Sequence, residues 1–215
     1  MFIAEEEIKT GGKMGVIELE KVKAPLYNGK KVSFDEYLKL KEDGFQYEII
    51  EGVMRVTPAP FSRHQRLILK ISYFIEGYLE KNPKGILYIA PRDVKFSKNN
   101  TYQPDILYIS KERLNINKEE YVDGSPDFII EILSKGTLSH DTRLKFYDYE
   151  KYGVREYWIF DPYNISFSEF YFLQNGKYEQ FEPEDNILKS KVIEGFEIDL
   201  IQLEKSLDPF KEVGK

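Results

Sequence analysis

The stretch SPDFIIEIL, residues 125–133, decides the fold of this 215-residue chain. Its apolar residues continue on both sides of Glu131, and such a run is typical of a strand that is covered on both faces of a sheet. An isolated carboxylate in that position would cost several kcal/mol. Glu131 is therefore expected to be protonated, paired with a base or bound to a cation. The plainer alternative is that it lies at the open end of the strand and pairs with a lysine.

The segments on either side of this strand predict an α/β fold. Residues 139–152 are expected to form a helix that Gly153 closes, and residues 155–160 to form the next strand. Together they make one right-handed crossover between parallel strands. Two more strands are expected upstream, at 86–97 and 101–110. The prediction is a central mixed β-sheet flanked by helices, with hairpins added at its sides.

The outer parts of the chain add helix and hairpin signals. Ser62 is expected to cap a long amphipathic helix that ends at Asn82-Pro83, because apolar side chains recur there at helical spacing. Ser33 begins a capping-box pattern for a short helix. Hairpin turns are expected at two dipeptides, Glu51-Gly52 and Asn175-Gly176. The expected organisation is an N-terminal arm at 1–30, one domain at 31–200 and a C-terminal tail at 201–215.

The composition excludes several kinds of site. Cysteine is absent, so thiolate metal sites, thiol nucleophiles and disulfides are excluded, and neither phosphate-binding glycine motif is present. The first residues lack the basic flank and apolar core of a signal peptide, and no apolar run could span a membrane. We therefore expect a cytoplasmic protein. The net charge of −6 means that nucleic acid would need a local basic patch, for which Arg63, Arg66 and Lys70 are candidates. A solvated helix face explains these three equally well.

A second carboxylate gives Glu131 a partner. Asp105 in YQPDILYIS also stands at the edge of an apolar strand run. Alone, Pro104-Asp105 would indicate only a turn. Two neighbouring strands that each carry one acid can place both acids on one divalent cation, however, and magnesium prefers one or two carboxylates completed by water and phosphate oxygens. The pair therefore predicts a magnesium site.

The helix after the quoted strand supplies a cation. Lys145 can point back toward the sheet, and Tyr149 lies four residues on, along the same helix face. A lysine there can position a water or stabilise charge on a phosphate undergoing substitution. The alternative is an ordinary solvated lysine, with Tyr149 as core packing.

Five motifs in order resemble a known family: YEIIEG, QPD, FIIEIL, the spaced set D-x-x-x-K-x-x-x-Y-x-x-x-G-V and EYWIFDP. Between about residues 34 and 182 the chain is similar to the Uma-type family of putative endonucleases within the PD-(D/E)XK nuclease superfamily. The resemblance implies a restriction-endonuclease-like core. Asp105 then matches the Asp of the PD motif, Glu131 the acid of (D/E)XK, and Glu48 an upstream acid that helps to hold the metal. Leu133 occupies the usual lysine position, and Lys145 from the next helix matches that lysine.

The resemblance also implies a function: magnesium-dependent hydrolysis of phosphodiester bonds in DNA by an endonuclease, with manganese as a possible substitute and a homodimer as the expected assembly. A rival reading is a catalytically silent member of the fold that binds nucleic acid or protein. A third is an oligomer built through the aromatic residues of the C-terminal hairpin, among them Phe167 and Phe170.

Other polar residues receive minor roles in these predictions. Gln103 is expected either to hydrogen-bond in the same pocket or to be a plain strand-edge residue. His64 is expected at the surface or at a helix cap. Asp93 and Asp161 are expected to be structural, the first at a strand edge and the second as a turn cap.

Overall fold

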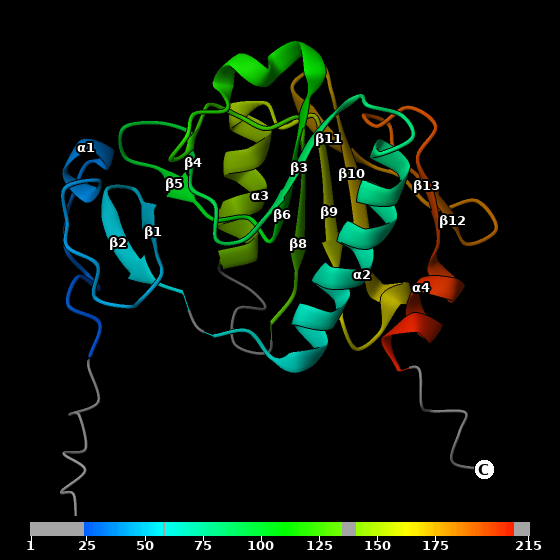
Figure 1. The fold of residues 1–215 in the computed structure, drawn as a ribbon, viewed down its shortest axis with the longest axis horizontal. Helices are drawn as coiled ribbons and strands as arrows, with labels where there is room; N and C mark the ends of the chain where they lie inside the picture. Colours follow the sequence, from blue (N-terminus) through cyan, green and yellow to red (C-terminus); the bar gives the residue numbers. More distant parts are fainter. Residues whose placement is uncertain (1–23, 58, 135–140, 209–215) are drawn as a thin grey trace, which may run out of the picture.

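The computed structural model describes residues 24–57, 59–134 and 141–208, and its main feature is a six-stranded mixed sheet (Figure 1). The strands lie in the order β11-β10-β9-β8-β6-β3. In that order their bounds are Lys177–Gln180, Glu169–Gln174, Glu156–Phe160, Phe128–Ile132, Ile106–Ser110 and Gly85–Ile89.

The quoted stretch forms β8, in the interior of this sheet. It pairs parallel with β9 on one side and antiparallel with β6 on the other, and all its apolar side chains are buried. Helix α3 (Asp141–Tyr152) connects β8 to β9, so the predicted crossover between parallel strands is confirmed. The predicted α/β architecture with a central mixed sheet is confirmed as well.

A second, smaller sheet stands beside the first, in the order β2-β1-β5-β4-β7. The bounds in that order are Val53–Val56, Tyr47–Ile50, Thr101–Tyr102, Val94–Lys95 and Val122–Asp123. The strands predicted at 86–97 and 101–110 are therefore each divided in two, one half in each sheet. Pro91 and Pro104 lie at the two breaks, where a residue without an N–H cannot continue a strand ladder.

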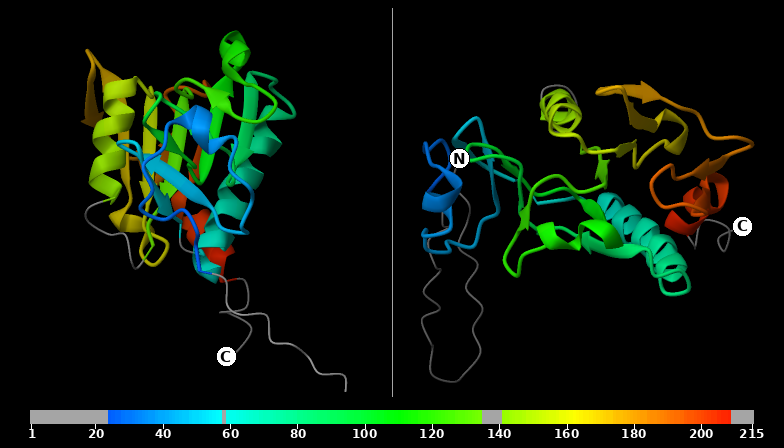
Figure 2. Two further views of the ribbon diagram at one scale, coloured as in Figure 1. Left: turned by 90° about the vertical axis from the view of Figure 1, so that its left-hand side faces the viewer. Right: turned by 90° about the horizontal axis from the view of Figure 1, so that it is seen from above.

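Helices cover both faces of the large sheet, as Figure 2 shows from two further sides. Helix α2 (Ser62–Leu79) buries a stripe that includes Leu67, Ile71 and Ile75 against one face, and α3 buries Tyr149 against the other. Phe61, not Ser62, is the residue that precedes the first turn of α2, one position earlier than predicted. The short helices are α1 (Phe34–Tyr37), the 3-10 turns η1 (Lys111–Ile116) and η2 (Ile165–Phe167), and α4 (Leu200–Leu207).

The predicted capping box and turns are present. Ser33 and Glu36 form the capping box of α1. Glu51 and Asn175 adopt positive φ at the two predicted hairpin turns, β1–β2 and β10–β11.

The core extends past residue 200, so the predicted tail at 201–215 needs correction. Strands β12 (Ile187–Lys189) and β13 (Glu197–Asp199) form a small ribbon that leads into α4. Leu203 and Leu207 of α4 are buried in the same core cluster as α2, because this amphipathic helix has an apolar side to cover. At the other end, residues 1–23 of the predicted arm lie outside the described residues, and Tyr27 packs against the small sheet.

Candidate active site

Strand register brings the two predicted carboxylates together. Strand β6 pairs with β8 so that Ile106 lies opposite Ile130, which places Asp105 opposite Glu131 at the next step of the antiparallel ladder. Residues opposite each other in such a ladder have Cβ atoms about 4.5–5.5 Å apart. The backbone N–H of Ile132 donates to Asp105 Oδ2 at 2.8 Å and fixes this carboxylate at the end of β6. The sheet thus holds the two acids side by side.

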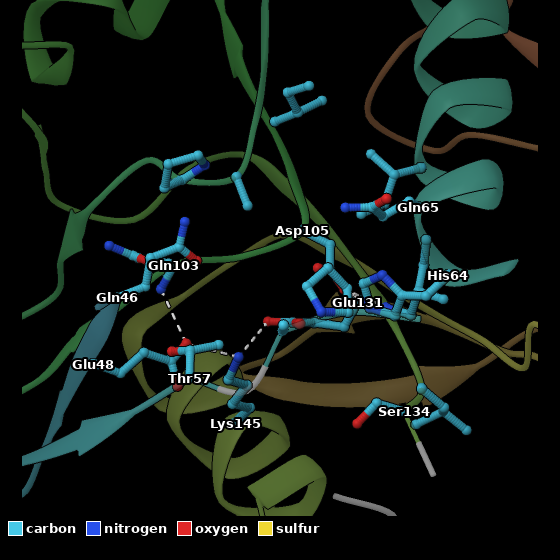
Figure 3. Close-up of a pocket in the computed structure, with 18 of the residues that line it drawn as sticks. Gln46, Glu48, Thr57, His64, Gln65, Gln103, Asp105, Glu131, Ser134 and Lys145 are labelled. Atoms are coloured by element: carbon cyan, nitrogen blue, oxygen red, sulfur yellow. Dashed lines mark hydrogen bonds and ion pairs between the residues drawn. The ribbon is translucent and has the colours of Figure 1, made fainter. Parts of the chain in front are cut away.

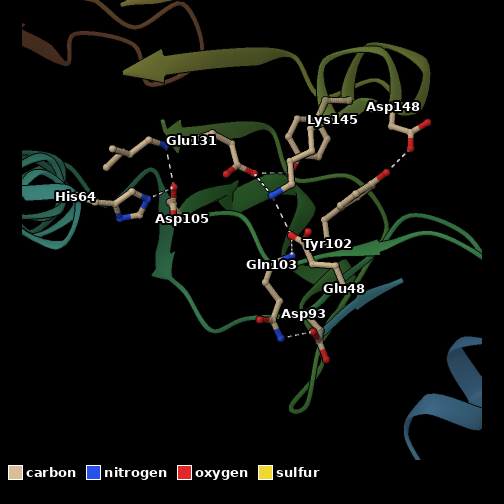
Figure 4. Close-up of polar contacts among 11 residues, drawn as sticks. Glu48, His64, Asp93, Tyr102, Gln103, Asp105, Glu131, Lys145 and Asp148 are labelled. Carbon is tan, nitrogen blue, oxygen red and sulfur yellow. Dashed lines mark hydrogen bonds and ion pairs between the residues drawn. The ribbon is translucent and has the colours of Figure 1, made fainter. Parts of the chain in front are cut away.

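Lys145 of α3 reaches the same point, as Figure 4 shows. Its ammonium nitrogen lies 3.0 Å from Glu131 Oε1 and 2.9 Å from Glu48 Oε1, so it joins an acid of the large sheet to one of the small sheet. The prediction that Asp105, Glu131 and Lys145 converge is confirmed. Glu48 lies there too, as predicted, rather than in bulk solvent.

These four residues line one cavity of about 850 Å³ between the two sheets and the first turns of α2. Figure 3 shows His64 and Gln65 of α2 on one side of it, and on the other Glu48 of the small sheet with Gln46 and Thr57, which flank the β1–β2 hairpin. The volume lies within the range of about 300–1,000 Å³ that is typical of pockets for small organic ligands. The cavity can therefore admit a ligand of nucleotide size.

Burial and neighbouring charges shift the pKa values of the central pair. Burial is the largest cause for Glu131 and raises its pKa to about 7; the Lys145 charge opposes this shift, while Asp105 and Glu48 add to it. For Lys145, burial disfavours the ammonium, but the charges of Glu131 and Glu48 outweigh burial and raise its pKa. Lys145 therefore stays protonated, while Glu131 holds a proton more tightly than an ordinary glutamate does.

Tyr149 has a polar role in addition to the packing that was expected. Its ring is fully buried, and its hydroxyl donates to Glu131 Oε1 at 2.8 Å. Because Lys145 and Tyr149 lie one turn apart on α3, both side chains reach the same carboxylate oxygen. Gln103 lines the cavity as predicted, and its amide donates to Asp93 Oδ1 at 2.8 Å.

The expectation for His64 was wrong. The side chain is only 9% exposed, and its Nε2 lies 3.2 Å from Asp105 Oδ2. Burial opposes the imidazolium form, but the hydrogen bond and charge of Asp105 outweigh burial and raise the pKa of His64. A signal was present in the sequence: His64 lies one turn before Leu67 on the stripe that α2 buries. Its inward position could have been inferred from that spacing.

Two of the three residues of the candidate basic stripe on α2 are engaged within the protein and are not free to bind phosphate. Arg63 donates to the carbonyl of Pro162 and pairs with Asp208. Arg66 donates to the carbonyls of Leu207 and Ser206 at the end of α4. Both guanidinium groups hold α2 against the C-terminal part of the chain. Asp161, in contrast, caps a turn as expected.

The carboxylate oxygens of this cavity are of the kind that magnesium accepts as ligands. Glu48, Asp105 and Glu131 each use one oxygen in the contacts above, and the other accepts no hydrogen bond from any residue that the structure describes. Hard carboxylate oxygens of this kind suit Mg²⁺ or Mn²⁺. In their present positions no three Asp, Glu or His side chains of the described ranges surround a single point as metal ligands would. Two carboxylates, Asp105 and Glu131, with water and substrate oxygens, are the donor set that fits.

A family model described as "Putative restriction endonuclease", Uma2, matches residues 34–201 of the chain. The chain belongs to the Uma2 family. This confirms the resemblance seen in the ordered motifs, and the matched range includes Glu48, Asp105, Glu131 and Lys145.

A solved structure resembles this Uma2 family member along most of its length. It is the crystal structure of a putative nuclease of the DUF820 family from Anabaena variabilis, with a TM-score of 0.68 and 22% sequence identity over 82% of this chain and 99% of that one. At this identity the likeness shows the shared restriction-endonuclease-like fold. No curated protein matches the chain. Within the ranges that the structure describes, no helix is both long and apolar enough to cross a membrane.

Proposed function

We propose that this protein is a metal-dependent endonuclease that hydrolyses phosphodiester bonds in DNA. The observation that carries the proposal is the convergence of Asp105, Glu131 and Lys145 in one cavity on the fold of a nuclease family. The residues come from three separate elements, the end of β6, the strand β8 and the helix α3. Two largely buried acids beside a largely buried cation cost folding free energy, so their presence at a cavity points to chemistry.

Asp105 and Glu131 would hold the magnesium ion, with Glu48 as a further carboxylate at the same cavity. Magnesium, when bound there, supplies Lewis-acid stabilisation of negative charge on the scissile phosphate. The protein keeps the two ligands in place before the ion arrives. The Ile132 N–H and His64 fix Asp105, and the Tyr149 hydroxyl fixes Glu131.

Lys145 supplies a permanent positive charge. Its raised pKa keeps the ammonium protonated throughout the neutral range. An ammonium in a cavity of low polarity stabilises developing negative charge far more strongly than one in water. Lys145 would therefore bind a phosphate oxygen or orient the attacking water, and it would release Glu131 as that carboxylate takes up its metal.

Strand cleavage tests the proposal. Supercoiled plasmid and linear DNA are incubated with magnesium or manganese, with EDTA as the metal-free condition. We expect Lys145→Met and Asp105→Asn to lower the cleavage rate by at least about 100-fold, the loss typical for removal of one group that stabilises transition-state charge. Asp161→Asn, which changes an acid outside the cavity, is the matched control and should cleave like the wild type. Cleavage that persists in EDTA, or that survives both cavity variants, would contradict the proposal.

The silent nuclease-fold module remains the second candidate. It is favoured by the ion pairs inside the cavity, in which Lys145 already contacts one oxygen of Glu131 and one of Glu48. Calorimetric titration with manganese separates the two, because the silent module predicts no binding that depends on Asp105. The oligomer built through hairpin aromatics has less support, since Phe170 is buried against Trp158 inside the core. The homodimer stays a prediction that sedimentation would test.

A further inference from the structure

One wall of the cavity is apolar and open. Phe61, Leu69 and Ile89 are among the lining residues, and they are 56%, 60% and 51% exposed. Phe61 and Leu69 lie eight residues apart at the start and in the middle of α2, on the side that faces the cavity together with Ile68. Ile89 ends β3, and Pro91 continues the surface. None of these side chains is needed by the chemistry proposed above.

The opposite wall has the reverse character. It is formed by the β1–β2 hairpin and carries the polar side chains Gln46, Arg55 and Thr57. Arg55 is exposed and makes no hydrogen bond or ion pair with any residue of the described ranges, although its strand neighbour is Glu48. A free guanidinium is suited to a phosphate oxygen. The acids and Lys145 lie between an apolar wall and a polar, cationic wall.

This division matches the two halves of a nucleotide. We propose that the apolar wall of Phe61, Leu69 and Ile89 receives a nucleobase of the substrate strand beside the scissile phosphate, while Arg55 contacts the backbone on the other side. A base of a duplex can lie on this wall only after it has left the base stack. The inference therefore rests on the proposed function and narrows its substrate to DNA with unpaired bases, such as single strands and frayed ends.

A base is the occupant that the geometry favours. Aromatic and aliphatic side chains at the edge of a cationic groove are the means by which proteins bind single strands, because every base has an apolar face to stack. A second copy of the chain would need a surface of about 800 Å² on each side. The three side chains instead line a cavity of about 850 Å³, in which a ligand of nucleotide size fits.

Binding tests the inference without catalysis. Short DNA strands that contain the fluorescent base 2-aminopurine are titrated with protein in EDTA, as single strands and as the matching duplex. The wild type should quench the single strand by stacking and bind it more tightly than the duplex. Phe61→Ala should weaken single-strand binding by roughly one to two powers of ten, and Phe61→Trp should restore it. Because neither Phe nor Ala caps a helix with its side chain, α2 is left unchanged.

Phe167→Ala is the matched control, since Phe167 is 71% exposed and does not line the cavity. It should bind both forms like the wild type. Equal affinity of the wild type for single strand and duplex, or unchanged quenching in Phe61→Ala, would overturn the inference. A change in sedimentation of Phe61→Ala toward a smaller species without any change in DNA binding would assign the wall to a second copy instead, and would overturn it too.

Cleavage separates this inference from the proposed function. A strand that lacks the base next to the cut site cannot contact the apolar wall. With magnesium, the wild type should cleave this strand as slowly as Phe61→Ala cleaves the intact strand. Combining the two changes should add no further loss, because both remove one contact. If the two losses of cleavage rate multiply, the proposal that the apolar wall receives a base is wrong, while the proposed nuclease function stands. If no DNA is cleaved at all, the proposed function fails, and the binding titration still decides whether the wall takes a base.

Discussion

At the scale of single residues, Lys145 explains how a carboxylate is accommodated in the strand SPDFIIEIL. Of the alternatives expected for Glu131, the pairing with a base is present, because the ammonium of Lys145 lies 3.0 Å from that carboxylate, while the bound cation stays a prediction. The same ammonium serves Glu48, so one cation faces two acids. This leaves the cavity one negative charge in excess even before Asp105 is counted. A divalent cation would meet that excess.

The first prediction concerns the buried lysine. Lys145→Met should lower the free energy of unfolding by about 3–5 kcal/mol at pH 8 in EDTA, because it leaves two buried carboxylates without their cation. The loss should shrink at pH 5, where the Glu131 carboxylate, whose pKa is raised by burial, can take up a proton. Urea denaturation at the two pH values measures both effects.

Lys177→Met is the control for this experiment. Lys177 pairs with Glu150 at 2.7 Å but is 78% exposed, and exposed pairs contribute little to stability because solvent screens them. Equal losses in the two variants would mean that the Lys145 pair is no more than a surface ion pair.

The second prediction concerns Glu156, a fully buried carboxylate outside the cavity. Burial raises its pKa to about 7, against the hydrogen bonds that it accepts from Ser190, the backbone of Lys191 and Val192, and Trp158. The folded state therefore holds a proton more tightly than the unfolded state, whose ordinary value is 4.5. This contribution to stability is complete below that value and is lost as the pH rises through about 7.

Glu156→Gln should accordingly flatten the decline of stability with pH. In the wild type, the pKa shift of Glu156 corresponds to a loss of up to about 3 kcal/mol in the free energy of unfolding as the pH rises from the unfolded to the folded pKa value. This pH-dependent loss should be absent from the variant. Thermal melts at a series of pH values measure the slope. Parallel curves for wild type and variant would show that Glu156 has an ordinary pKa in the folded state.

At the scale of elements, the sequence predicts those that follow a local pattern better than it predicts how distant elements pack together. The strand β8, the helix α3 and the hairpin at Asn175-Gly176 follow local patterns, and all three are present. The C-terminal helix α4 shows the limit, because nothing local distinguishes a docked amphipathic helix from a tail. Arg66 of α2, a candidate for phosphate binding or for a solvated face, instead donates to carbonyls at the end of α4 and helps to dock it.

The third prediction tests whether α4 belongs to the core. Leu203→Ala should destabilise the protein by about 2–5 kcal/mol, the usual range for a buried leucine truncated to alanine, since Leu203 is fully buried against α2. Ile201→Ala is the matched control, because Ile201 lies on the same helix and is 48% exposed. Urea denaturation of both gives the comparison. If Leu203→Ala loses less free energy of unfolding than Ile201→Ala, α4 is an appended tail and does not belong to the core.

At the scale of the whole molecule, the cavity depends on the placement of two sheets. Glu48 stands on the small sheet, Asp105 and Glu131 on the large one, and Lys145 on a helix that covers the large one. Cations that bridge these parts should stabilise the whole fold. This gives the fourth prediction: saturating magnesium, at about 100 times its dissociation constant, should raise the free energy of unfolding by about 2.7 kcal/mol.

Asp105→Asn should remove that gain, because it removes one of the two proposed ligands. Asp161→Asn, which alters a turn-capping acid away from the cavity, should keep it. Calorimetric melts with magnesium and with EDTA provide the measurement. If the wild type melts at the same temperature in magnesium and in EDTA, the acids of the cavity bind no magnesium and only take part in the contacts with Lys145.

The sequence by itself determined the parts of this protein that depend on local pattern. An unbroken apolar run predicted a buried strand, the helical period predicted α2, and turn dipeptides predicted both hairpins. It also indicated Asp105 and Glu131 as candidate residues, because carboxylates placed in or beside apolar segments are costly enough to need a reason, and the family resemblance added Lys145.

Only the tertiary structure decided which side chains meet. The division of two predicted strands between two sheets, the docking of α4 and the contact of His64 with Asp105 join residues that lie far apart in the chain. Such contacts depend on which element packs against which, and a local pattern can show which side of an element is apolar but not which other element covers it. The spacing on α2 can indicate the inward side of His64 but not its contact with Asp105, and Arg63 and Arg66, candidates for phosphate binding or for a solvated face, instead donate to backbone carbonyls elsewhere in the protein.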